Sequence, residues 1–152
     1  MNIRFVKSST KKKILQELNA LFGISKLPYL LIESGKNKIR AFSGSLSKDE
    51  IKLISRLINI EIIGAYLLKE EENHIRLSLD AAHLLKDEIT KNIIEINSQQ
   101  LNDWIRGKDL DIQAQKGVVI IKNNKDFIGC GISNGLKIFN YIPKERRLRS
   151  NN

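Results

Sequence analysis

The chain has 152 residues, of which 41% are hydrophobic and 28% are charged. These proportions are typical of soluble globular proteins, and the length suits one ordinary domain or two small ones. Its apolar runs are much shorter than the roughly 20 residues of a transmembrane helix, and its start lacks the features of a signal peptide. The single cysteine, Cys130, excludes an internal disulfide and suits a reducing compartment, so we expect a cytoplasmic protein without membrane contacts.

The charge balance favours a polyanionic partner. Lysine and arginine total 26 against 17 acidic residues, which gives a formal net charge of +9. Because phosphate contacts dominate the affinity of proteins for nucleic acids, this excess is suited to RNA or DNA. Basic globular proteins that bind no nucleic acid are also common, so charge alone leaves both alternatives open.

The first half of the chain alternates short strands with helices. Ser8 or Ser9 offers an N-cap for a first helix, and Gly23 offers its C-cap. The other elements expected here are a strand at 2–6, a hairpin of 29–33 and 38–42, a helix after the capping box Ser47/Glu50, strands at 61–68 and 74–79, and a short helix at 81–85. This half therefore predicts a mixed α/β domain with an antiparallel sheet.

The second half changes to several short strands with one inserted helix. We expect a strand at 92–96, a helix capped by Ser98 that reaches Trp104, and strands at 117–122, 126–132 and 136–142. This pattern is typical of a small β-barrel. The predicted fold class is therefore α+β, with an N-terminal domain of residues 1–88, a barrel domain of residues 89–152 and a boundary near Glu88.

Patterns of catalytic and metal sites are missing from the sequence. One cysteine and two histidines give no zinc-ligand spacing, and there is no Walker A loop, nucleophile elbow or dinucleotide-binding glycine motif. Cys130 lies between two glycines of an apolar run, which indicates a buried side chain, although a pair with His74 or His83 stays open. We therefore expect no cofactor, no metal and no enzymatic activity.

Two basic segments of the second half carry chemistry suited to RNA. In the segment 104–108, Arg106 and Lys108 flank Gly107, whose lack of a side chain lets a phosphate approach the backbone, while Trp104 is expected in the core. The segment 140–149 leaves the sheet at Pro143 and is either a solubilising tail or, as Leu148 favours, packed against the domain. The candidate RNA-binding residues are Arg106, Gly107, Lys108, Lys116, Lys137, Lys144, Arg146, Arg147 and Arg149.

Five segments of the chain carry a family resemblance. They are Ile75-Arg76-Leu77-Ser78, Trp104-Ile105-Arg106-Gly107, Gly117-Val118-Val119, Ile128-Gly129-Cys130-Gly131 and the run from Asn140 to Arg147. In this order they resemble the PUA-type RNA-binding region at the C-terminus of Nop/Sun-type RNA cytosine methyltransferases. The order of an α+β domain before the barrel is also similar to the two-domain pre-PUA/PUA factors of ribosome biogenesis.

The resemblance implies binding of structured ribosomal or transfer RNA, and the family's basic positions fall on Arg106, Lys108, Lys144, Arg146 and Arg147. The methyltransferases have a cysteine after proline or threonine and a glycine-rich S-adenosylmethionine loop, which this sequence lacks. We therefore expect a non-catalytic adaptor or assembly factor that binds RNA and contacts a ribosome-assembly protein or an RNA-modification enzyme.

Two alternatives remain open. The first is an accessory subunit that supplies RNA affinity to a separate modification enzyme such as a cytosine methyltransferase, and it predicts an apolar patch on the N-terminal domain. The second is a hydrolase or transferase that uses Cys130 or His74.

Overall fold

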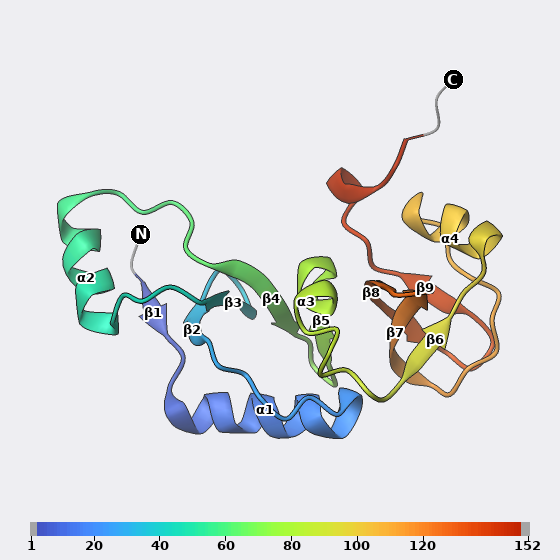
Figure 1. Cartoon of the computed structure of the whole chain (residues 1–152), viewed down its shortest axis with the longest axis horizontal. Coiled ribbons are helices and arrows are strands. Elements are labelled where there is room, and N and C mark those ends of the chain that lie inside the picture. The colour runs from blue at the N-terminus through green and yellow to red at the C-terminus, as the bar shows by residue number, and fades with distance from the viewer. Residues whose placement is uncertain (1–2, 150–152) are drawn as a thin grey trace.

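The structure is a computed structural model that describes residues 3–149, and it consists of two β-sheets with a short helix between them (Figure 1). The first half forms β1 (Arg4–Phe5), α1 (Ser8–Phe22), β2 (Leu30–Glu33), β3 (Lys38–Phe42), α2 (Lys48–Leu57), β4 (Ala65–Glu70), β5 (Ile75–Leu77) and α3 (Leu79–Leu84). The second half forms β6 (Ile93–Glu95), α4 (Ser98–Ile105), β7 (Gly117–Asn123), β8 (Asp126–Ser133), β9 (Ile138–Asn140) and the 3₁₀ helix η1 (Lys144–Arg146). The chain is therefore α+β, as expected.

The first sheet is antiparallel, with the strands in chain order from β1 to β5. On β3, Ile39 and Ala41 are buried, whereas Lys38 and Arg40 alternate with them and point to the opposite face. Helix α1 packs on the buried face through Ile14, Leu18 and Phe22 (Figure 1). The other face is covered in part by α2, whose Ile51 is buried against Ile32 of β2, and it also carries the side chains of Lys38 and Arg40.

The second sheet has the order β6-β7-β8-β9, in which β6 is parallel to β7 and the other pairs are antiparallel. An isolated bridge joins Leu110 to Ile138 beside β9. Within residues 3–149 no sheet closes on itself, so the expected barrel is not confirmed. A sheet closes into a barrel only when its first strand pairs with its last. Here the edge strand β6 pairs with β7, and the edge strand β9 pairs with β8.

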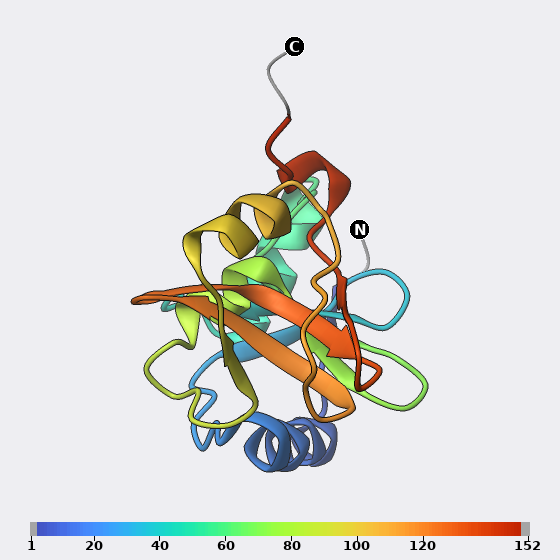
Figure 2. The same ribbon diagram turned by 90° about the vertical axis from the view of Figure 1, so that its right-hand side faces the viewer.

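Trp104 anchors α4 on the second sheet, as expected of a core residue. Its side chain is 0% exposed, and its indole Nε1 donates a hydrogen bond of 2.7 Å to the carbonyl oxygen of Ile128. A Cβ atom at Gly131 would lie 2.9 Å from the Trp104 ring, so only glycine permits this approach. Figure 2 shows α4 lying across the strands of this sheet.

The largest hydrophobic core crosses from one half to the other. It contains Leu68, Leu77 and Ala81 from the first half together with Ile120 and Cys130 from the second. The predicted domain boundary near Glu88 lies between α3 and β6, within this continuous packing. The division into two domains stays a prediction, but the two halves share one apolar interior.

The predicted N-caps of α1, Ser8 or Ser9, and of α4, Ser98, lie one or two residues after the observed ones. Helix α1 starts at Ser8 itself, and Lys7 is the N-cap without a side-chain hydrogen bond. In α4, Ser98 is the first helical residue, because Asn97 and Gln100 form a capping box through hydrogen bonds of 2.9 Å in both directions. An amide at the N-cap performs the same role as the hydroxyl expected one residue later.

Several strands are shorter than predicted, among them those expected at 61–68, 74–79, 92–96 and 136–142. The strand expected from Glu61 begins at Ala65, after Gly64 with φ of +72° interrupts the extended conformation. The last strand is confined to residues 138–140, because the side chain of Asn134 accepts hydrogen bonds from the backbone of residues 136 and 137 and folds them into the preceding turn. The capping box of α2 and the left-handed C-cap at Gly23 are confirmed.

We expect Trp104→Phe to lower the free energy of unfolding by about 2–4 kcal/mol, since it leaves the Ile128 carbonyl without its donor and opens a cavity in the core. Urea denaturation followed by circular dichroism measures the change. Phe139→Leu is the control, because Phe139 is 39% exposed and makes no such hydrogen bond among the described residues. An equal loss in both variants would contradict this role of Trp104.

The Cys130 thiol is expected to be chemically inert in the folded protein. Burial raises its pKa to about 12, so almost no thiolate is present at neutral pH. A thiol-specific dye should react with the native protein at least about 100-fold more slowly than with free cysteine, and at the ordinary rate in denaturant. Rapid labelling of the native protein would contradict this prediction and support the alternative of an enzyme that uses Cys130.

Candidate RNA-binding surface

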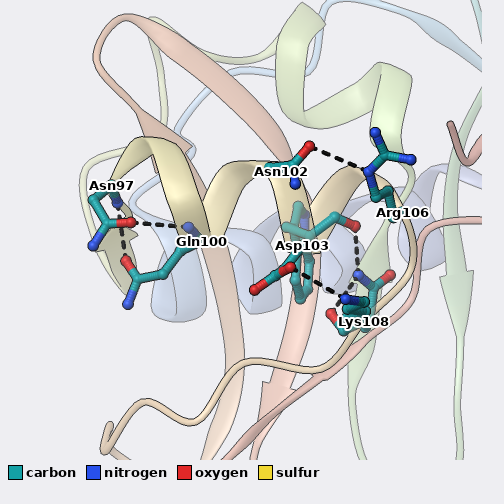
Figure 3. Close-up of polar contacts among 8 residues, drawn as sticks. Asn97, Gln100, Asn102, Asp103, Arg106 and Lys108 are labelled. Carbon is teal, nitrogen blue, oxygen red and sulfur yellow. Dashed lines mark hydrogen bonds and ion pairs between the residues drawn. The ribbon is translucent and has the colours of Figure 1, made fainter. Parts of the chain in front are cut away.

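The C-terminal end of α4 carries the first predicted basic turn. Arg106 is the C-cap, and Gly107 continues the turn with φ of +90°. The Arg106 Nε donates a hydrogen bond of 3.2 Å to Asn102, and the Lys108 Nζ lies 3.5 Å from a carboxylate oxygen of Asp103 (Figure 3). Lys108 nevertheless keeps 66% of its side chain exposed, so its charge is available to a ligand.

Asn140 at the end of β9 fixes this turn. Its side-chain amide donates hydrogen bonds to the carbonyl oxygens of Trp104, at 2.7 Å, and Lys108, at 3.0 Å. Its backbone N–H in turn donates to the carboxylate of Asp109 at 2.8 Å. The exit of β9 is therefore tied to the end of α4.

The C-terminal segment then returns to α4. The backbone N–H of Leu148 donates to the carbonyl oxygen of Ile105 at 2.9 Å, and the Arg147 Nε donates to the carbonyl oxygen of Ile142 at 2.9 Å. The Arg147 side chain passes over Gly107, where a Cβ atom would lie 2.4 Å from its Cδ. The packing expected for this segment is confirmed, although its RNA contacts stay predictions.

The predicted residues fall into separate groups. We define the C-terminal basic surface as Arg106, Gly107, Lys108, Lys144, Arg146 and Arg147. Lys116 and Lys137 lie instead beside the β8–β9 turn, where Lys137 is 3.9 Å from Asp111 and Lys116 approaches Gly135. Arg149 is exposed beyond the segment that packs on α4.

Arg146 is already engaged by a carboxylate. Its two terminal nitrogens lie 3.1 and 2.9 Å from the two oxygens of Asp80 in α3, a two-point ion pair that ties η1 to the first half of the chain. The hydrogen bond from Arg146 lowers the pKa of the Asp80 carboxyl. A phosphate at Arg146 would therefore have to share the guanidinium with Asp80.

A cleft that the sequence analysis missed lies between the two halves and has a volume of about 590 Å³. We define the junction cleft by its charged and aromatic lining residues, which are Lys38, Arg40, Tyr66, Lys69 and Arg76 from the first sheet, Asp80 from α3, and Tyr141, Glu145 and Arg146 from the C-terminal segment. Apart from Arg146, its cations come from three strands, so no local run of charge in the sequence indicated them. In the sequence, Lys38 and Arg40 could have been recognised from the alternation of apolar and charged residues along β3.

The lining residues of the junction cleft contact one another through cation–π interactions and ion pairs. The Arg76 guanidinium carbon lies 4.2 Å from the ring centroid of Tyr141, and the Lys38 Nζ lies 5.6 Å from that of Tyr66. Glu71 lies 3.0 Å from the Lys69 Nζ and 3.2 Å from Arg76. The hydrogen bond with Lys69, together with the charges of both cations, lowers the pKa of the Glu71 carboxyl, whereas burial raises the pKa of the Tyr66 hydroxyl.

The described part of the chain gives no evidence of a metal centre or membrane span. Among residues 3–149, no three His, Cys, Asp or Glu side chains gather in a way that could hold a metal ion. Over the same residues, no helix has the length and apolar character needed to cross a membrane.

One family model matches the part of the chain that contains the C-terminal basic surface. Residues 91–148 match the model described as the Methyltransferase RsmF PUA domain, whereas no curated protein matches the chain. The matched residues include β6 to β9, α4 and η1. PUA domains are RNA-binding domains, so the match supports binding of RNA by this half. Residues 91–148 therefore form a PUA-type region that resembles the C-terminal region of Sun-type methyltransferases.

Proposed function

We propose that this protein is a non-catalytic adaptor or assembly factor that binds structured ribosomal or transfer RNA through its C-terminal basic surface. The observation that carries the proposal is the packing of Arg147 over Gly107 within the PUA-type region. This contact joins two basic segments that are about forty residues apart into one surface.

The surface has the chemistry of a phosphate-binding site. Lys108 and Lys144 are exposed and supply compact charges, whereas the guanidinium groups of Arg106 and Arg147 are planar and suit phosphate oxygens or stacking on bases. Because Gly107 has no side chain, the Arg147 side chain can pack directly over the turn. Contacts of this kind position an RNA and supply affinity without reading its sequence.

The buried Cys130 supports a non-catalytic role. A thiol with its pKa raised to about 12 is protonated at neutral pH and is a poor nucleophile. The residue packs in the core shared by both halves, where its small size fits the space between neighbouring apolar side chains. We therefore assign it a packing role.

Reversing the charge of both exposed lysines, in Lys108→Glu/Lys144→Glu, should weaken RNA binding by about tenfold or more without unfolding the protein. Binding of a labelled hairpin RNA, measured by fluorescence anisotropy at several salt concentrations, tests this. The wild-type affinity should fall steeply with salt, and the variant should show a smaller slope because it releases fewer counterions.

The matched control is Lys125→Glu, an exposed lysine in the β7–β8 turn outside the C-terminal basic surface. It should retain most of the wild-type affinity. Equal weakening by the control and the double variant would show that net charge, rather than this surface, determines binding. Wild-type affinity in the folded double variant would remove the surface from the proposal.

An accessory subunit of an RNA-modification enzyme is the second candidate, and a group of exposed apolar residues on the first half favours it. The group consists of Leu53, Leu57, Ile58 and Ile62, on α2 and the segment that follows it. Leu57 is 76% exposed, while Ile51 on the same helix is buried against the first sheet. Helix α2 therefore presents apolar side chains on both of its faces, as a protein-binding helix does.

This candidate predicts that Leu53→Glu/Leu57→Glu abolishes co-purification with an RNA cytosine methyltransferase of the same organism and leaves hairpin binding unchanged. Affinity purification with mass spectrometry provides the measurement. Leu136→Glu is the control, because Leu136 is 69% exposed and lies in the β8–β9 turn of the second sheet, whereas α2 packs on the first. Absence of any methyltransferase from the wild-type sample would count against the accessory role.

A further inference from the structure

Three cations occupy one cross-strand row on the floor of the junction cleft. Lys38 on β3 is directly opposite Lys69 on β4, which is directly opposite Arg76 on β5. Like charges in such positions destabilise an antiparallel sheet. Among residues 3–149, Glu71 is the one carboxylate that forms ion pairs with this row, through Lys69 and Arg76, so the row keeps an excess of positive charge.

Arg40 adds a fourth cation beside this row. Its guanidinium donates hydrogen bonds to the carbonyl oxygens of Ile63, at 3.0 Å, and Gly64, at 2.5 and 3.1 Å, which hold it in place without neutralising it. Among residues 3–149, no carboxylate lies within 4.0 Å of Lys38 or Arg40. A bound anion would offset the repulsion within this group, so the floor is suited to phosphate.

Two tyrosines supply aromatic surface, one on the floor of the junction cleft and one on its wall. Tyr66 lies on the floor in β4, and Tyr141 lies on the wall formed by the C-terminal segment, where Arg76 stacks on its ring at 4.2 Å. Tyr141 is 41% exposed. Aromatic rings next to cations are what proteins use to bind unpaired bases, because the ring stacks on the base while the cations hold the phosphates.

The dimensions of the junction cleft favour an unpaired nucleotide over a duplex. Its volume of about 590 Å³ lies within the range of roughly 300–1,000 Å³ that is typical of sites for small organic molecules. A nucleotide is a molecule of this size, whereas a base-paired helix is much wider.

The cleft is continuous with the C-terminal basic surface. Arg146 lines the cleft, and in η1 it stands between Lys144 and Arg147 of that surface. We propose that the junction cleft binds an unpaired nucleotide of the RNA whose structured part lies on the C-terminal basic surface. This inference rests on the proposed function, since it assigns a second contact to the same RNA.

A free mononucleotide offers the same combination of phosphate and base. The experiment therefore uses three probes, which are a blunt hairpin RNA, the same hairpin with a short unpaired adenosine tail, and adenosine monophosphate. Anisotropy with the two labelled hairpins measures what the tail contributes, and competition with adenosine monophosphate measures the free nucleotide. We expect the tail to tighten binding to the wild-type protein by about tenfold, and adenosine monophosphate to compete weakly.

Two variants remove one component of the cleft each. Lys38→Glu alters the cation row, and Tyr141→Leu removes the exposed ring. Both should lose the contribution of the tail and keep the wild-type affinity for the blunt hairpin. The matched controls are Lys36→Glu, in the β2–β3 turn outside the cleft, and Phe139→Leu, an aromatic residue of similar exposure that does not line it. The controls should keep both affinities.

The outcomes separate this inference from the proposed function. Binding of the blunt hairpin with no gain from the tail overturns the inference and leaves the proposed function standing, as does a tail effect that survives in both cleft variants. Binding of adenosine monophosphate with no tail effect assigns the cleft to a free nucleotide instead. Failure of both hairpins to bind the wild-type protein overturns the proposed function, and the inference with it. Circular dichroism verifies that each variant is folded.

Discussion

The packing of α3 against both sheets is the constraint on which the rest of the structure depends. Ala81 and Leu85 lie in the same apolar core as Leu68 of the first sheet and Ile120 and Cys130 of the second. Because such interiors are close-packed, the core holds the two sheets in one arrangement. That arrangement creates the junction cleft, since its floor belongs to one half and its Tyr141 wall to the other. The ion pair between Asp80 of α3 and Arg146 of η1 also connects the C-terminal segment to the first half of the chain.

The distribution of charge does not contribute much to the stability of the protein. Exposed ion pairs contribute only about 0–1 kcal/mol each, and like charges in facing strand positions oppose folding. The apolar cores therefore stabilise the protein, whereas the ion pairs of Lys69, Arg76 and Arg146 contribute little to its stability. Only Arg146 belongs to both the junction cleft and the C-terminal basic surface, and its pairing with Asp80 limits its freedom. A single RNA that contacts both regions would be held by its phosphates along a continuous path.

Much of the local structure follows from the sequence alone, because it depends on neighbouring residues. Ser47 and Glu50 form the predicted capping box, and Gly23 ends α1 in the predicted left-handed conformation. The burial of Trp104 and Cys130 also follows from residue type and apolar context. The α+β class and the basic turn after α4 were predictable for the same reason. In each case the decisive contacts are within a few residues of one another or depend only on burial.

The tertiary structure alone decided how distant segments meet. Among residues 3–149 the second sheet does not close, so the expected barrel is not confirmed. Closure depends on which strands pair at long range, and no local pattern encodes the parallel pairing of β6 with β7. The cation row of the junction cleft exists only through the register of three strands. The ion pair between Arg146 and Asp80 likewise joins residues that are 66 positions apart in the sequence. Residue types specified where charge and apolar surface would occur, whereas the shared core and the strand register determined which of those charges face the same cleft.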